Sequence, residues 1–171
     1  MITKIEAAKR NIEFSIRCLF QEEDNLPIIL VASSAFQVLR DIAEHQGVGD
    51  LHKSFKSMVA PGKEKEIWNA FNRVANFIKH ADKKPGETLE HFNEELPETI
   101  ILIACLYYYE IAASLSTEMS AFTKWLSVSK EELSGIWQVQ SDAEPIVDFR
   151  ELPRAERLKY GMSFIRTACS A

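Results

Sequence analysis

The residues best suited to chemistry in this sequence lie between positions 69 and 87, where a helical pattern runs into a charged turn. A helix advances about 100° per residue, so residues three, four and seven positions apart share a face. One face of this expected helix is apolar: Ile67, Phe71, Val74 and Ile78. The opposite face gathers polar residues: Asn69, Arg73, Asn76 and His80. Amides, a guanidinium and an imidazole form an unusual column, because Lys and Glu fill most solvated helix faces.

This polar column could act on a phosphodiester. Arg73 and His80 lie two turns and about 20° apart around the helix, with Asn76 between them. An arginine holds a phosphate through its fork and stabilises charge that develops on it. An imidazole moves a proton to or from a ribose hydroxyl or a leaving oxygen near neutral pH. Arg73, His80 and Asn76 are therefore the candidate catalytic residues.

The surroundings of the column are basic. Between positions 63 and 84, Lys63, Lys65, Arg73, Lys79, Lys83 and Lys84 outnumber Glu64, Glu66 and Asp82. We expect Asn69, Lys79, Asp82 and Lys83 to bind the ligand. The alternative is a solvated face without function, on which the helix dipole alone favours a histidine in the last turn.

The segment Arg73-VANFIK-His80 resembles the motif of the HEPN superfamily, in which an Arg and a His are separated by four to six residues on a helical bundle. The resemblance covers the second to fourth long helices. It implies a metal-independent ribonuclease, or a relative that does not cleave. It also implies a motif near a dimer interface, where two copies build one RNA-cleaving cleft. In that family a polar residue often follows the arginine, whereas this chain has Val74.

Two further segments bear on this resemblance. Arg40-DIAE-His45 also fits the spacing, with the polar Asp41 after the arginine. On a continuous helix these two side chains lie about 140° apart, so they converge less easily. The segment NFIKHADKKP (76–85) resembles a signature of uncharacterised bacterial helical proteins, which implies no activity.

Other common sites are missing from the sequence. It contains no Gly-x-x-x-x-Gly-Lys phosphate loop, no Gly-x-Gly-x-x-Gly and no Gly-x-Ser-x-Gly. No histidine follows a glutamate by three positions, as a di-iron bundle would require. A metal site could be drawn from His80, Asp82, Glu87 and His91, but a solvated charged turn accounts better for these residues, since an intact ligand spacing is missing. We expect neither a metal nor a cofactor.

Composition narrows the class of protein. A chain of 171 residues with 46% hydrophobic residues is long enough for one soluble domain with a core, and its net charge of −5 argues against a general nucleic-acid binder. Cys18, Cys105 and Cys169 form no Cys-x-x-Cys pair, which indicates inert thiols in a reducing compartment. The first residues lack a signal-peptide core, and the longest apolar run (100–109) is about half a membrane span. We therefore expect a cytoplasmic protein without a membrane segment.

The pattern of elements is helical throughout. Long helices are expected over residues 2–23, 25–46, 63–80 and from Pro97 through the run IILIACLYYYEIAASL. Short helices are expected over 51–58, 121–128 and 129–137, and a short helix or helical turn over 87–95. An irregular or extended stretch is expected over 142–152, and a final helix from Pro153 to about Cys169. The predicted fold is all-α: an up-and-down bundle of four main helices with short extra helices and a C-terminal helical extension. Residues 1–140 form the bundle domain, and 141–171 form a linker and a helix that packs on the bundle or a partner subunit.

Local signals set several of the expected boundaries. Asp24 or Asn25 can cap the second long helix, and Gly47 can end it. Ser129 and Glu132 stand at the spacing of a capping box, which predicts a helix that begins at Ser129.

Three interpretations of function remain open. The first is a small helical protein, expected to be a homodimer, that binds a ligand, RNA or protein partner over Asn69–Glu87. The second is a HEPN-like ribonuclease or an inactive relative. The third is an accessory or assembly protein that works through the apolar helix after Pro97.

Overall fold

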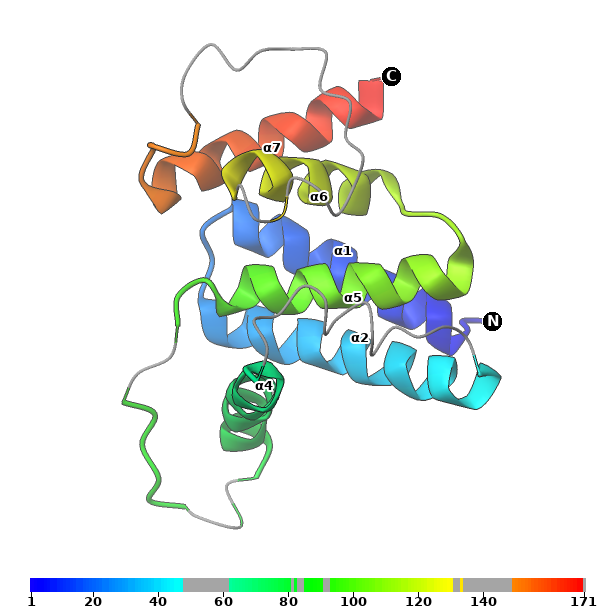
Figure 1. Ribbon diagram of the computed structural model, residues 1–171, viewed down its shortest axis with the longest axis vertical. Coiled ribbons are helices and arrows are strands. Elements are labelled where there is room, and N and C mark those ends of the chain that lie inside the picture. The colour runs from blue at the N-terminus through cyan, green and yellow to red at the C-terminus, as the bar shows by residue number, and fades with distance from the viewer. Residues whose placement is uncertain are drawn as a thin grey trace.

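The computed structural model describes residues 1–47, 62–80, 82, 85–90, 93–130, 133 and 149–170. In this part of the chain there are six helices and no strands, and the helices pack as a bundle (Figure 1). The predicted all-α bundle is confirmed.

The first two helices form a hairpin with capped ends. Helix α1 (Lys4–Phe20) begins after Thr3, whose Oγ1 accepts a hydrogen bond of 3.1 Å from the backbone N–H of Glu6. Helix α2 (Asn25–Gln46) begins after Asp24, whose carboxylate accepts one of 2.8 Å from the N–H of Leu26. It ends at Gly47, which has a φ of 61°, a left-handed conformation that costs glycine little. The predicted cap at Asp24 and the predicted stop at Gly47 are confirmed.

Helix α5 (Leu96–Ala112) lies in the middle of the bundle, beside α2 and in contact with α1. Every residue from Ile100 to Cys105 is buried, and so is Tyr107. The apolar surface on all sides of α5 is therefore covered largely within the chain. In Figure 1, α2 and α5 run in the same direction, with α4 between them in the sequence.

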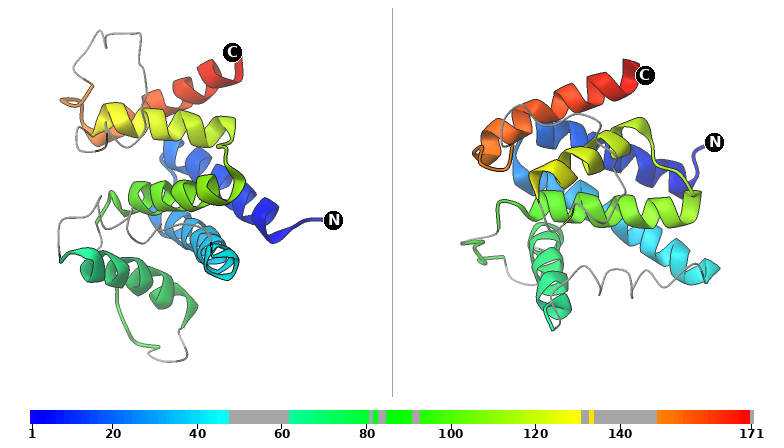
Figure 2. Two further views of the ribbon diagram at one scale, coloured as in Figure 1. Left: turned by 45° about the vertical axis from the view of Figure 1, so that its right-hand side comes forward. Right: turned by 45° about the horizontal axis from the view of Figure 1, so that its top comes forward.

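A second layer covers the other side of α1. Helices α6 (Thr117–Ser129) and α7 (Arg154–Ser170) pack on each other and on α1, and they lie across the bundle from α4 (Figure 2). Ser116 caps α6 with its hydroxyl. The indole N–H of Trp125 on α6 donates a 2.8 Å hydrogen bond to the backbone carbonyl of Arg157 on α7. The C-terminal helix thus lies against its own bundle.

Some predicted short helices differ from the structure. Ser129 is the last residue of α6, and its hydroxyl donates to the carbonyl of Trp125 at 2.8 Å. The prediction that a new helix begins at Ser129 was therefore wrong. Residues 121–128 belong to the 13-residue helix α6, which is longer than predicted. Of the segment 87–95, predicted as a short helix or a helical turn, residues 87–90 and 93 are neither, whereas 94–95 form a turn in which the Leu96 N–H donates to the carbonyl of Asn93 at 3.0 Å. The predicted helix over 51–58 and most of the stretch over 142–152 fall outside the described residues.

Helix α2 also bears on the expectation that no segment crosses a membrane. By length and composition alone it could span one, and among the described residues no other helix could. Of its most apolar window 44% is buried inside the structure, as befits a helix packed between α1 and α5. A core helix passes the same test, so this finding is weak evidence for a membrane span.

Candidate functional site on helix α4

Helix α4 (Glu64–Lys79) carries the polar column on a strongly amphipathic surface. It packs against α2, with Val74 and Ala75 each 2% exposed and Ile78 partly buried against the core. This packing fixes which side of the helix meets solvent. The exposed side bears Asn69, Arg73, Asn76 and Lys79.

Arg73 differs from most arginines of this protein in having no partner among the residues that the structure describes. Five other arginines contact carboxylates: Arg10, Arg17, Arg40, Arg154 and Arg157. Among the described residues no group pairs with Arg73 or accepts a hydrogen bond from it. An exposed guanidinium without a carboxylate is available to an anion from outside.

The chain leaves the helix at His80, at the end of the column. His80 has a φ of −124° and a ψ of 50°, and its backbone N–H donates to the carbonyl of Asn76 at 2.9 Å. Its side chain is 42% exposed, and its Nδ1 lies 3.9 Å from a carboxylate oxygen of Asp82. This distance is too long for a hydrogen bond. The predicted ligand residue Lys83 lies outside the described residues.

Part of the positive charge around the polar column of α4 is neutralised by a carboxylate. Lys63 forms a 2.6 Å ion pair with Glu66, so this lysine adds little net charge to the surface. Lys65 and Lys79 remain exposed beside the column. The positive charge on the exposed side of α4 therefore comes from Lys65, Arg73 and Lys79.

The second Arg–His segment is placed differently. Arg40 on α2 contacts the carboxylates of Asp41 at 2.8 Å and Glu44 at 3.8 Å, and its guanidinium lies 5.8 Å from the centre of the Phe36 ring. These contacts occupy Arg40 within its own helix. His45 is exposed and lines a groove with α1. Of the two segments that fit the HEPN spacing, only the one on α4 has an arginine that contacts no carboxylate in the described part of the chain.

The described residues offer no metal centre, because no three of their His, Cys, Asp or Glu side chains gather closely enough to hold an ion. His80 and Asp82 are near each other, whereas His91 lies outside the described residues. The thiols of Cys18 and Cys105 are free. Burial raises the pKa of both, and Cys105 is fully buried, so neither is an activated nucleophile.

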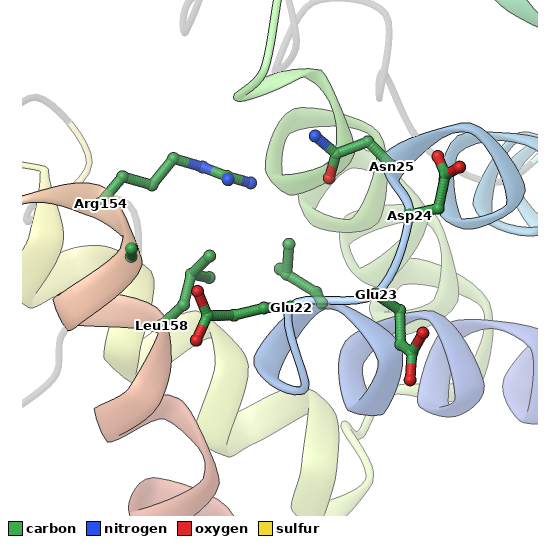
Figure 3. Close-up of a pocket in the computed structure, with 8 residues that line it drawn as sticks. Glu22, Glu23, Asp24, Asn25, Arg154 and Leu158 are labelled. Atoms are coloured by element: carbon green, nitrogen blue, oxygen red, sulfur yellow. The ribbon is translucent and has the colours of Figure 1, made fainter.

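The structure also reveals a charged cluster that sequence reasoning missed. Glu98 on α5 is 2% exposed, and its carboxylate accepts a 2.8 Å hydrogen bond from Arg154 on α7. Arg154 lines a cavity of about 260 Å³, in which it reaches from α7 towards the turn between α1 and α2 (Figure 3). The facing wall is acidic, with Glu22, Glu23 and Asp24. Glu98 and Arg154 are 56 positions apart, so no local spacing could have paired them.

No family model matches this chain, and no curated protein and no solved structure matches it either. The case for a site on α4 therefore rests on the exposed side chains of that helix.

Proposed function

We propose that this small all-helical protein binds single-stranded RNA along the exposed face of α4. We define this α4 face as Asn69, Arg73, Asn76, Lys79 and, at its end, His80. The observation that supports the proposal most directly is the exposed Arg73 guanidinium, which no carboxylate among the described residues neutralises.

The side chains of the α4 face suit a nucleic acid better than an apolar partner. Arginine binds a phosphate with two parallel hydrogen bonds, and lysine adds a point charge. The amides of Asn69 and Asn76 can donate to phosphate oxygens or to the edges of unpaired bases. The whole chain carries a net charge of −5, so its total charge does not attract RNA, and binding through the cations of this face should weaken as salt rises.

Arg73→Ala is expected to weaken the binding of a fluorescent single-stranded RNA about tenfold, since a hydrogen bond to a charged group contributes roughly 1.5–3 kcal/mol. The slope of log affinity against log salt should fall by about one. Anisotropy titrations at several salt concentrations measure both quantities.

Arg10→Ala is the matched control, because Arg10 is equally a helix-surface arginine but lies on α1 and pairs with Glu6. It should bind RNA as the wild type does. No binding by the wild type, or equal losses in the two variants, would contradict the proposal.

A second candidate function, metal-independent RNA cleavage, is favoured by the exposed imidazole of His80 at the end of the same face. In this reaction a ribose 2′-hydroxyl loses a proton and its oxygen attacks the adjacent phosphorus. The 5′-oxygen then leaves with a proton, and a 2′,3′-cyclic phosphate remains. His80 would carry one of these protons, and Arg73 would stabilise the charge on the phosphorus oxygens. This arrangement also agrees with the resemblance of Arg73-VANFIK-His80 to the HEPN motif.

His80→Ala is expected to abolish cleavage of a mixed RNA pool in the presence of a chelator while changing RNA affinity by less than about threefold, because Arg73 and Lys79 carry the permanent charges that bind the phosphates. His45→Ala is the control, because His45 is also exposed but lies on α2, and this variant should cleave normally. Binding without cleavage by the wild type would leave the first function and reject the second.

A further inference from the structure

An apolar groove opens at one end of the bundle, between the beginning of α1 and the end of α2. It has a volume of about 700 Å³. Its apolar lining includes Ile5 on α1 and Val38 and Ile42 on α2, all of them half-buried. Its rim carries opposite charges on its two sides, Lys4 on α1 and Asp41 on α2. The groove lies on a different helix pair from the Arg73 side chain.

Beside this groove, two apolar residues are left in solvent. Met1 is fully exposed and Ile2 is 61% exposed, although the next residue, Thr3, lines the groove. Thr3 is extended, with a φ of −81° and a ψ of 163°, and its side chain caps α1. The chain before Thr3 therefore runs away from the bundle, as Figure 2 shows at the N label. Ile2 does not fill the groove of its own chain.

We propose that the groove binds a second copy of this chain, with Ile2 of each copy inserted into the groove of the other. A protrusion and a depression on the same end of one molecule are self-complementary about a two-fold axis, which is the commonest symmetry of protein dimers. Burial of Ile2, Ile5 and Ile42 drives the association.

Charge complementarity supports a second copy as the occupant. Lys4 is two residues from Ile2, so insertion of Ile2 brings Lys4 of one copy towards the groove of the other. Asp41 stands on the far rim of that groove, where Arg40 of the same helix contacts its Oδ1 at 2.8 Å. The second carboxylate oxygen is left for Lys4 of the other copy. Each copy thus supplies both the cation and the anion, and two Lys4–Asp41 contacts form per dimer.

The first test compares variants of two exposed apolar residues, Ile2 before α1 and Phe14 on α1. Sedimentation velocity over a range of concentrations measures the dimer dissociation constant of each. Ile2→Asp should raise the dimer dissociation constant at least tenfold. Phe14→Asp is the control, because Phe14 is 48% exposed on α1 but does not line the groove, and its dissociation constant should be unchanged. Both positions are exposed, so neither variant should unfold, and circular dichroism checks this.

The second test exchanges the rim charges. Lys4→Asp and Asp41→Lys should each weaken the dimer several-fold, and the double variant should recover most of the loss, because the pairs form again with reversed signs. A wild type that stays monomeric, a dimer that Ile2→Asp leaves intact, or a double variant that does not recover would overturn the proposal. So would a monomer whose groove takes up the probe bis-ANS in a manner that Ile42→Asp abolishes, since a small apolar ligand would then be the occupant. RNA binding by the α4 face is measured separately, so either proposal can fail alone.

Discussion

Arg154→Met is expected to lower the free energy of unfolding by roughly 3–5 kcal/mol, since it leaves a buried charge without its partner. Glu98 is 2% exposed, and Nε of Arg154 is the hydrogen-bond partner of its carboxylate, at 2.8 Å. Without the guanidinium, the carboxylate must stay buried and uncompensated, take up a proton, or open the contact between α5 and α7. Urea unfolding followed by circular dichroism measures the loss.

Two further variants test this explanation. Arg10→Met removes an arginine from an exposed ion pair and should change stability by less than about 1 kcal/mol. The double variant Glu98→Leu with Arg154→Met should recover most of the stability, because an apolar pair of similar size needs no compensation. If Arg154→Met cost no more than Arg10→Met, the buried pair would not be holding α7 to the bundle.

Gly161→Ala is expected to destabilise the protein by about 1–3 kcal/mol, although alanine is the better helix former by about 1 kcal/mol. A Cβ placed on Gly161 would overlap the ring of Phe20, whose atoms lie directly over the glycine. The ring cannot move aside easily, because it is 3% exposed and stacks edge-on against Trp125 at a centroid distance of 5.0 Å. Helix α7 would have to shift from α1. Thermal and urea unfolding measure the change.

Gly86→Ala is the control for Gly161→Ala, since a Cβ on Gly86 would meet nothing within 4 Å. It should alter stability by less than about 0.5 kcal/mol. Combining Gly161→Ala with Phe20→Leu should cost less than the sum of the two single changes, because a smaller side chain leaves room for the methyl group. Strict additivity, or stabilisation by Gly161→Ala alone, would show that α7 does not approach Phe20 so closely.

The sequence by itself determined the helical elements that depend on local contacts. Helix α2 ends at Gly47 because glycine adopts a left-handed φ easily. It is capped by Asp24 because that carboxylate lies close enough along the chain to accept a hydrogen bond from the N–H two residues later. The burial of Val74 opposite the exposed Arg73 follows from helical periodicity alone. The sequence also showed that α5 is apolar on every side. It could not show whether that surface is buried inside the bundle or against another subunit.

Only the tertiary structure decided which side chains from distant positions meet. It buried Glu98 beside Arg154, set Gly161 against Phe20, and left Arg73 without a carboxylate among the described residues. Caps and periodicity act within one or two turns of the chain. Ion pairs, close helix contacts and grooves depend instead on how whole helices pack, which no local spacing specifies.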